Sequence, residues 1–405
     1  MELRKWPRKN DPGSIAARQG ALDGRIDTEV FEQDLTPWVE AQEALTGLSV
    51  IPTAVIGPMP ISLGEYELSE PDGTLAETGR KTDEVYVPLA HTEGSLSDSL
   101  YRGARAAAES GGFRTEVLRD RMTRASAFAC NSAEDAAVLA RWIEAELPRM
   151  RDWLAERDDA WISRYAKLRE VETYVAGPLC HVMWSFTTGD ACGPNMMTRN
   201  AYALNMGYVM EHAPLKPERA ILEANMGGDK KPSHRYFERG GHGKTVIAEV
   251  TLTEEAVRRV LRTTIDDLLE LSWAGTHGAV ASGMQSVAFT PATAIAAVFA
   301  ATGQDLGMVG TSSMAHGTGK RVEGGLNAGI RLPGLEVGTV GGGTTLPYAR
   351  AWLGLMDCAG PGKVYRFAQI VAAATLALEI SASAAMATSG SENFFKAHFE
   401  RGGLR

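Results

Sequence analysis

The stretch LEANMGGDKKPS, residues 222–233, separates two parts of the chain that differ in character. Two glycines lead into the charged run Asp229-Lys230-Lys231 and a proline, and Glu223 lies six residues before Asp229. Such a flexible, charged run predicts an exposed loop and not a piece of the core. An ammonium group in that loop can polarise a carbonyl and stabilise an oxyanion. The alternative is a solvated turn, and we interpret residues 222–233 as a catalytic loop.

The composition is that of a globular protein with an excess of acidic residues. The 405 residues are 44% hydrophobic and 22% charged, with a formal net charge of -9. This charge argues against a nucleic-acid partner, because phosphate contacts need clustered Lys and Arg. The cysteines show no C-x-x-C spacing, which indicates the reduced thiols of a cytoplasmic protein. The apolar run 370–387 carries Glu379 and many Ala and Ser, which favours a core helix over a membrane span.

The apolar pattern predicts an α+β fold in which a small domain interrupts a large one. Residues 1–42 are interpreted as an N-terminal arm with one short helix near FEQDLTPWVEAQEAL. Residues 43–125 and 222–405 form the large domain in this interpretation, and residues 126–221 form the small one. Its expected elements are a long helix SAEDAAVLARWIEAELPRMRDWLAER capped by Ser132, the strands KLREVETYVAG and CHVMWSFTTG, and a helix from about residue 196.

Several further motifs carry groups that suit catalysis or close backbone approach. Glu93 of HTEGSL ends a predicted strand and can act as a general acid, although a glutamate at a helix start is also common. FTTGDACGPNM (186–196) and GTVGGGTTLP (338–347) are glycine-containing turns after strands, which suits an anion or a dinucleotide. GHGKT resembles the end of a P-loop, but Glu238 stands where that motif needs glycine, so a nucleotide triphosphatase is excluded.

The ordered set EALTG, IGPMPI, HTEGSL, MTRAS, TGDACGPNM, GDKKP, GHGKT, ATGQD, GTVGGGT and KAH resembles 3-hydroxy-3-methylglutaryl-coenzyme A (HMG-CoA) reductase. The match runs from about residue 43 to 401, and the T-E-G form is similar to the class I branch. The resemblance implies a large catalytic domain with an inserted small, ferredoxin-like domain that binds the cofactor. It also implies active sites between the subunits of a homodimer or homotetramer, and no metal.

The resemblance implies roles for Glu93, Lys230, Asp305 and His398. Lys230 would bind the carbonyl oxygen and stabilise the oxyanion, and Glu93 would supply a proton to that oxygen. Asp305 would lie between them and tune their protonation, and His398 would protonate the departing thiolate. Reduction of a thioester needs an electrophile at oxygen and protons for sulfur and for the alcohol, so these roles are chemically consistent.

The resemblance also implies an NADPH site. An arginine suits the 2′-phosphate of NADPH, which favours this cofactor over NADH. The implied cofactor-binding residues are Ser163, Arg164, Asp190, Ala191, Gly193, Asn195, Gly341, Gly342, Gly343 and Thr344.

The chain departs from the family pattern at the substrate end. It has Glu223, Trp273, Thr290 and Thr293 where the family has Ser, Lys, His and Asn. The family's Ser and Lys help to bind the terminal carboxylate of the hydroxymethylglutaryl group, and a carboxylate at Glu223 disfavours an anion there.

Other residues at this end retain positive charge. Arg124 and Lys231 remain as substrate-binding candidates, and pairing of Glu223 with either one is the alternative to a repelling carboxylate.

The sequence therefore predicts a cytoplasmic NADPH-dependent reductase of an acyl thioester, carried on CoA or a carrier protein, with an acyl group other than HMG. Authentic HMG-CoA reductase is the alternative. A non-catalytic homologue that binds only cofactor or partner is an alternative of another class. No nucleic acid, membrane or metal partner is expected.

Overall fold

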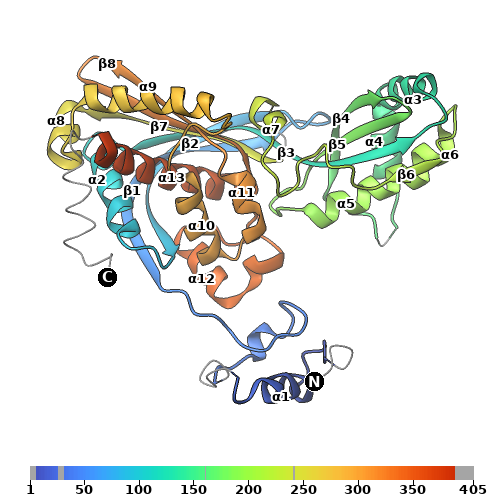
Figure 1. Cartoon of the computed structure of the whole chain (residues 1–405), viewed down its shortest axis with the longest axis horizontal. Helices are drawn as coiled ribbons and strands as arrows, with labels where there is room; N and C mark the ends of the chain where they lie inside the picture. The colour runs from blue at the N-terminus through green and yellow to red at the C-terminus, as the bar shows by residue number, and fades with distance from the viewer. Residues whose placement is uncertain (1–5, 26–31, 160, 240–241, 388–405) are drawn as a thin grey trace.

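The computed structural model describes residues 6–25, 32–159, 161–239 and 242–387. The chain has the predicted α+β class, with a long mixed sheet covered by helices and a second, smaller sheet at one end (Figure 1). An N-terminal arm projects from the body below the large sheet (Figure 1).

The large sheet has the strand order β2-β1-β3-β7-β9-β8. β1 and β3 run parallel where Ile61 pairs with Phe113, and the other neighbouring pairs are antiparallel. β1 continues through Gly57-Pro58, where its pairing with β2 shifts between Ile56 and Met59. The strands are β1 (Thr53–Leu68), β2 (Leu75–Ala90), β3 (Phe113–Ala129), β7 (Gly243–Thr253), β8 (His316–Val322) and β9 (Gly325–Leu335).

Helix α13 (Val364–Ala387) is the centre of the large core. It is apolar around its whole circumference, as is typical of a helix buried on all sides. Its length and composition would suffice to cross a membrane, but 72% of its apolar window is buried inside the fold. The helices α2 (Leu96–Ala108), α9 (Ile265–Ala281) and α10 (Pro291–Thr302) pack against it. The sequence correctly predicted a buried core helix here.

The small lobe, residues 122–221, is built on a second sheet around the end of β3. β5 (Leu179–Thr187) pairs with β3 and with β4 (Lys167–Ala176), and β6 (Arg219–Ile221) pairs with β3. The fully buried rings of Phe128, Trp184 and Phe186 form its core. The helices of the lobe are α3 (Ala133–Ala145), α4 (Leu147–Ala155), α5 (Pro194–Ala203) and α6 (Met210–His212), with a π-helical turn at Leu204–Val209.

β3 belongs to both sheets without interruption. Arg121 pairs with Gly243 of the large sheet, and the next residue, Met122, pairs with Phe186 of the small sheet. The division expected between residues 125 and 126 lies inside this strand.

Two helix predictions were wrong in their extent. The long helix expected after Ser132 is broken at Glu146 into α3 and α4, because Pro148 sits in the first turn of α4, where proline is tolerated and has no amide to continue the previous helix. The predicted Ser132 cap is confirmed, since its side chain accepts a hydrogen bond from the Asp135 amide. The helix expected near residues 31–45 is only a 3-10 turn at Thr36–Trp38.

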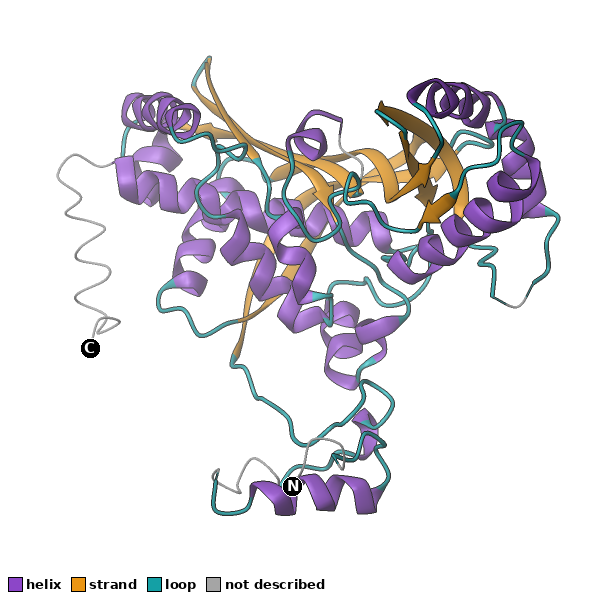
Figure 2. Ribbon diagram, turned by 45° about the vertical axis from the view of Figure 1, so that its right-hand side comes forward, coloured by secondary structure: helices purple, strands orange, loops and turns teal. Residues whose placement is uncertain are grey.

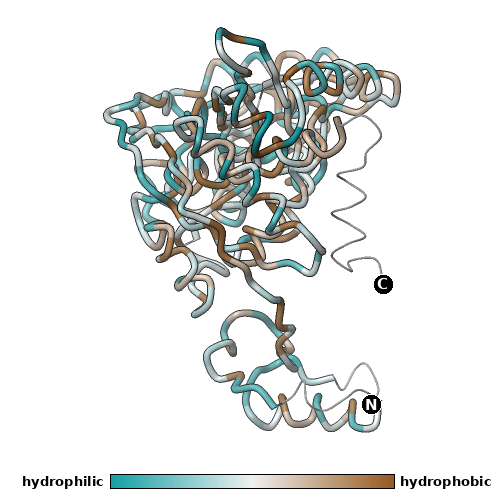
Figure 3. Tube along the Cα trace, turned by 90° about the vertical axis from the view of Figure 1, so that its left-hand side faces the viewer, coloured by the Kyte–Doolittle hydropathy of each residue, from teal (hydrophilic) through white to brown (hydrophobic). Residues whose placement is uncertain are grey.

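The arm instead carries α1 (Pro12–Leu22), seen at the bottom of Figure 2. The guanidinium of the buried Arg18 donates hydrogen bonds to the Pro7, Lys9 and Leu45 carbonyls, which ties the arm together. Trp38 stacks on Tyr348 of the body at 5.5 Å between ring centroids. Figure 3 shows hydrophobic residues where the arm joins the body, and Val50 and Ile51 are exposed there.

The remaining elements are short and lie mainly in loops around the large sheet. They are α7 (His234–Arg239), α8 (Glu254–Ala256), a π-helical turn at Val257–Leu261, 3-10 turns at Leu306–Met308 and Gly342–Thr345, α11 (Val309–Ser312) and α12 (Pro347–Leu355).

Candidate active site

Lys230 lies in an exposed loop between β6 and α7, as the sequence predicted for residues 222–233. Its φ of 57° is left-handed, a conformation that costs a non-glycine residue roughly 1–2 kcal/mol. The preceding glycines are packed closely, because a Cβ at Gly228 would lie 2.7 Å from the Tyr236 ring and one at Gly227 would lie 3.3 Å from Ala125. The strained turn is therefore fixed by its contacts with β3 and α7.

The Lys230 ammonium forms an ion pair with Asp305, at 2.7 Å between Nζ and Oδ2. Asp305 follows α10 and also accepts a hydrogen bond from the Gly307 amide at 2.9 Å. The bond to Asp305 raises the pKa of Lys230, and the charges of Asp229 and Glu336 act in the same direction. The ammonium form is thus stabilised at the position where the resemblance places an oxyanion partner.

Glu93 opens onto a groove of about 480 Å³ beside α10. It is exposed and lies between the end of β2 and the start of α2. Thr293 of α10 and Leu306, the neighbour of Asp305, line the same groove. The structure therefore brings Glu93 and the Lys230–Asp305 pair to adjoining parts of one surface. His398 lies outside the described residues.

Arg124 of β3 joins the catalytic loop to the strand beneath it. Its Nη1 lies 2.5 Å from Oε2 of Glu223 and 3.1 Å from Oδ2 of Asp229. Glu223 also accepts a hydrogen bond from the Asn225 amide at 2.7 Å. Of the two partners considered for Glu223, the structure selects Arg124, so this carboxylate is neutralised in part within the chain.

The other predicted substrate-binding residues are dispersed. Lys231 is exposed, and its ammonium donates to the Asp229 carbonyl at 3.2 Å. Trp273 is 66% exposed on α9 and packs on His277. Thr290 donates its hydroxyl to Glu379 at 2.7 Å, which anchors the start of α10. Thr293 lies in the groove with Glu93, and Lys231 directly follows Lys230.

Three glycine-containing loops meet next to Asp305. The Thr339 amide donates to the Asp190 carbonyl at 2.8 Å, which joins the loops at 189–193 and 338–343. A Cβ at Gly303 would lie 2.2 Å from the Gly343 carbonyl oxygen, so only glycine allows this approach. The side chain of Gln304 exchanges hydrogen bonds with the backbone of Gly338. The two predicted cofactor loops are therefore fixed against the Asp305 turn.

The Asp190 carboxylate is engaged by the beginning of α13. It accepts hydrogen bonds from the amides of Gly362, Lys363 and Val364 at 2.8–3.1 Å. This arrangement satisfies amides that would otherwise lack partners at the helix start.

The other predicted cofactor-binding residues of these loops contribute mainly backbone hydrogen bonds and turn conformations. Ala191 accepts a hydrogen bond from the Thr188 hydroxyl, and Thr344 donates to the Gly341 carbonyl. Gly193 has a left-handed φ of 84° just before α5, and Asn195 is exposed in its first turn. The remaining glycine, Gly342, also has a positive φ, of 54°.

Ser163 and Arg164 lie at a separate pocket of about 220 Å³ on the small lobe. The Ser163 backbone is held by Asn200, which accepts from its amide and donates to its carbonyl, both at 2.9 Å. Arg164 is exposed and lies over the ring of Tyr165. The pocket is lined by more cations than carboxylates: Arg151, Arg157, Arg164, Lys167 and Arg169, with Glu70 and Asp152.

Comparison with known proteins identifies the family. A family model described as hydroxymethylglutaryl-coenzyme A reductase matches residues 28–402. The chain belongs to the HMG-CoA reductase family. The HMG-CoA reductase of Pyrococcus abyssi is 36% identical over 354 residues, which cover 85% of this chain and 81% of that protein. The enzyme of that name from Aspergillus terreus is 36% identical over 341 residues, or 82% of this chain and 31% of that protein.

The fold comparison agrees with the family. A structure of the class II HMG-CoA reductase from Streptococcus pneumoniae, bound to NADPH in open conformations, has a TM-score of 0.66 with this chain at 17% identity. The match covers 92% of this chain and 97% of that chain. The resemblance to HMG-CoA reductase and the α+β fold that it implied are confirmed.

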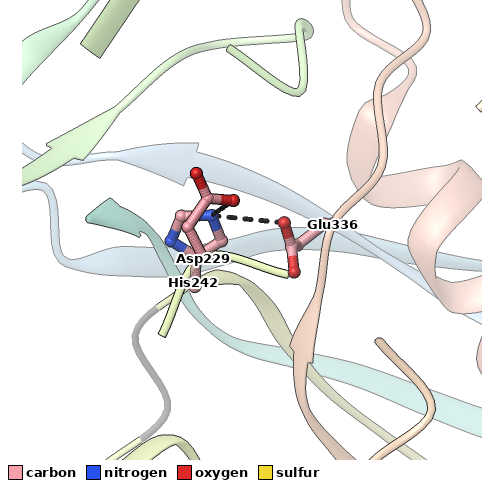
Figure 4. A group of neighbouring side chains, drawn as sticks. All are labelled: Asp229, His242 and Glu336. Atoms are coloured by element: carbon pink, nitrogen blue, oxygen red, sulfur yellow. Dashed lines mark ion pairs between the residues drawn. The ribbon is translucent and has the colours of Figure 1, made fainter. Parts of the chain in front are cut away.

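The sequence did not reveal a second group of acidic and basic residues beneath the catalytic loop of this HMG-CoA reductase homologue. Asp229, His242 and Glu336 place one ligand-type atom each within 4.8 Å of one another (Figure 4). The motifs GDKKP, GHGKT and LEVGT contain these residues, but the motifs are far apart along the chain. Only the pairing of β7 with β9 brings the last two together, so the pattern alone gave no signal.

Proposed function

We propose that this protein reduces HMG-CoA to mevalonate with NADPH as the reductant. The observation that carries this proposal is the Lys230–Asp305 ion pair at 2.7 Å, beside a groove lined by Glu93 and against two glycine loops. The relatives named HMG-CoA reductase, at 36% identity over most of the chain, support the same acyl group. These relatives favour authentic HMG-CoA reductase, which the sequence analysis kept as the alternative, over a reductase of another acyl group.

The residues divide the chemistry as follows. Conversion of the thioester to an alcohol consumes two NADPH and two protons and releases CoA thiol and two NADP⁺, and NADPH supplies the two hydrides. Lys230 holds the carbonyl oxygen and stabilises the negative charge that develops on it. Asp305 keeps that lysine charged, and Glu93 donates the proton that completes the alcohol. His398 is assigned the proton for the thiolate on family resemblance alone.

The small lobe provides the chemistry to recognise NADPH. Its pocket carries Arg157, Arg164 and Lys167, and guanidinium groups bind phosphate with paired hydrogen bonds. The close approach of Gly303 to Gly343, and the joined loops at 189–193 and 338–343, leave backbone free of side chains beside Asp305. These features fit a phosphorylated dinucleotide whose reactive end reaches the Lys230–Asp305 pair.

Lys231 is the residue that we assign to the far carboxylate of the acyl group. Its ammonium is exposed, and it binds a backbone carbonyl and no carboxylate among the contacts found in the described chain. The charge of Glu223 is compensated only in part, because Arg124, 2.5 Å away, also contacts Asp229. An anionic acyl group is therefore compatible with this end of the site.

A second candidate function is reduction of an acyl thioester, on CoA or a carrier protein, that lacks this carboxylate. The observation in its favour is that Arg124 already contacts two carboxylates, Glu223 and Asp229. An aromatic residue at Trp273 in place of the family's lysine favours the same choice, and an ammonium-bearing acyl group would pair with Glu223.

The deciding experiment measures NADPH oxidation with HMG-CoA and with neutral and amino-bearing acyl-CoA and acyl-carrier thioesters of similar size. Mevalonate as product, with the highest kcat/KM for HMG-CoA, is the expected result. Preference for a neutral or cationic thioester selects the second function instead. If none of the thioesters is turned over by a folded protein that binds NADPH, the chain is a non-catalytic homologue.

We further propose a homodimer or homotetramer, as the family resemblance implies. Large apolar side chains on and after α9 are exposed in the single chain, namely Trp273, Val280, Met284 and Phe289. Such a patch is typical of a protein interface. Light scattering coupled to gel filtration measures the subunit number, and a monomer at micromolar concentration would refute this part.

A further inference from the structure

Asp229, His242 and Glu336 form a buried group that the mechanism above does not use. The side chains of His242 and Glu336 are fully buried, and that of Asp229 is 21% exposed. His242 Nε2 lies 3.2 Å from Oε2 of Glu336 and 3.7 Å from Oδ1 of Asp229. Figure 4 shows both carboxylates directed at the same nitrogen of the ring.

These three atoms have no hydrogen-bond partner, one another included, in the part of the chain that the structure describes. Buried polar atoms without partners are costly, so their convergence requires an explanation. Three arrangements would explain it: a divalent metal between the three atoms, an imidazolium, or a neutral N–H donor between the carboxylates. The ring's second nitrogen distinguishes between them.

Nδ1 of His242 lies 3.3 Å from the Thr123 backbone amide and 3.0 Å from the Thr123 hydroxyl. A backbone N–H can only donate, so it bonds to Nδ1 only where Nδ1 carries a lone pair and no proton. The amide contact favours the tautomer with its proton on Nε2, between the two carboxylates. A metal-bound histidine usually donates from its other ring nitrogen, and an imidazolium would carry a proton on both, so in either case Nδ1–H would donate to the Thr123 hydroxyl and face the Thr123 amide.

The location of His242 follows from the strand pairing. His242 directly precedes β7 and Glu336 directly follows β9, and Lys244 pairs with Leu335 in these two strands. Gly243 permits the close approach, since a Cβ there would lie 2.5 Å from the Leu335 carbonyl. Glu336 is further held by the Thr311 hydroxyl, which donates to its Oε1. The ring and this carboxylate are thus fixed by the large sheet.

Asp229, by contrast, belongs to the catalytic loop and directly precedes Lys230. Its Oδ2 is bound by Arg124 of β3, and its Oδ1 faces His242. Two contacts from the sheet therefore hold the residue next to a lysine whose φ of 57° is strained.

We propose that His242 is a positioning residue: its neutral ring places Nε2–H between the carboxylates of Glu336 and Asp229, and this electrostatic contact holds the Lys230 turn in its catalytic conformation. This inference rests on the proposed function for the role of Lys230, but the tautomer and the contacts of His242 do not. Loss of this contact lets Asp229 move, and a displacement of Lys230 by about 1 Å can cost on the order of 100-fold in rate.

The first test is the protonation state. In protein labelled with ¹⁵N-histidine, one residue should show a protonated Nε2 and an Nδ1 that accepts a hydrogen bond, and this signal should be absent from His242→Gln. A signal with both nitrogens protonated would overturn the neutral ring. So would a shift of that signal on treatment with a chelator or on addition of Zn²⁺ or Mn²⁺.

The second test uses matched variants. Glutamine carries an N–H donor near the position of Nε2, whereas leucine has a similar size and no donor. We expect His242→Gln to keep kcat within about threefold and His242→Leu to lower it roughly 10- to 100-fold with the KM for NADPH unchanged. His181→Leu, which changes another partly buried histidine on β5 of the small lobe, should leave kcat unchanged. Equal kcat values for the Gln and Leu variants would refute the positioning role.

A third readout does not depend on turnover. Acylation of Lys230, measured by mass spectrometry relative to Lys231, should increase in His242→Leu and not in His242→Gln, because a released turn separates Lys230 from Asp305. Unchanged labelling in the leucine variant would refute the inference even if the enzyme is active. If the unmodified protein reduces no thioester, the proposed function fails, while the spectrum and the labelling still decide the role of His242.

Discussion

At the catalytic loop Lys230 and Arg124 already have carboxylate partners, whereas the small-lobe pocket is lined by five cations and two carboxylates. Lys230 pairs with Asp305, and Arg124 contacts Glu223 and Asp229. In the small-lobe pocket, burial and the nearby charge of Arg169 lower the pKa of Arg151. In this pocket Arg169 pairs with Glu70, whereas Arg164 is exposed over the Tyr165 ring, so the pocket keeps a surplus of positive charge that an anion can neutralise.

The largest expected effect is at the catalytic loop. Lys230→Ala should lower kcat at least about 100-fold, because loss of one oxyanion donor has this typical consequence. The matched variant Lys231→Ala should instead raise the KM for HMG-CoA with kcat largely retained. Steady-state kinetics on both folded variants checks the pair. Near-normal turnover by Lys230→Ala would show that the Lys230 ammonium does not stabilise the oxyanion.

Asp305→Asn tests whether the partner keeps Lys230 charged. The pKa of Lys230 is raised, chiefly by Asp305, so the ammonium is present at lower pH and is lost as the pH rises through that raised value. Without Asp305 this loss should begin earlier, and the alkaline limb of the kcat/KM profile should move to lower pH. An alkaline limb that stays in place would mean that another group sets it.

Arg164→Ala tests whether the small-lobe pocket binds the 2′-phosphate of NADPH. The KM for NADPH should rise roughly tenfold, since a hydrogen bond to a charged group contributes about 1.5–3 kcal/mol and this arginine is exposed. The KM for NADH, which has no 2′-phosphate, should change little. Arg149→Ala is the control, because Arg149 is 77% exposed and pairs with Glu146. A preference of the unmodified protein for NADH would contradict the assignment.

Asp190→Ala examines a carboxylate that was predicted to bind cofactor but contacts the start of α13. The free energy of unfolding should fall by about 1 kcal/mol, the usual effect of losing a helix cap. Asp190→Asn retains an acceptor and should be destabilised less. Denaturant titration of the two variants measures the difference, and equal stability of Asp190→Ala and the unmodified protein would exclude the capping role.

The smallest expected effect is at the substrate end. Glu223→Ser releases Arg124 from one of its two carboxylates, and kcat/KM for HMG-CoA should rise by up to about fivefold, as befits a partly exposed ion pair. Adding Trp273→Lys should extend the gain. No gain in the double variant would weaken the claim that these positions set the acyl preference.

The local signals explain which parts of the fold could be predicted. α10 starts with Pro291 and ends at Gly303, and α13 is a long apolar run, so both were recognisable. α1 has few apolar residues and is stabilised by bonds from Arg18 to distant carbonyls, so its sequence alone gave little indication. The break at Glu146 depended on Pro148, which was present but was not interpreted as a helix start.

The sequence could predict single residues of the candidate site that lie in a recognisable motif, but it could not predict their distant contacts. Lys230 and Asp305 could be named from GDKKP and GQD, because family resemblance transfers single positions. The contact between Arg124 and Glu223 joins residues 99 positions apart, and the sequence left two partners for Glu223 open. Such pairs depend on strand register and loop path, which no local pattern specifies.

The unbroken course of β3 has a mechanical consequence. Because Arg121 is bonded into one sheet and Met122 into the other, this crossing between the lobes has no unpaired linker, whereas the return crossing is the loop 222–233. Thr123 and Arg124, the residues that contact His242 and the catalytic loop, lie directly after that junction and would turn with it. The strand thus connects the small lobe directly to the two residues that contact His242 and the catalytic loop.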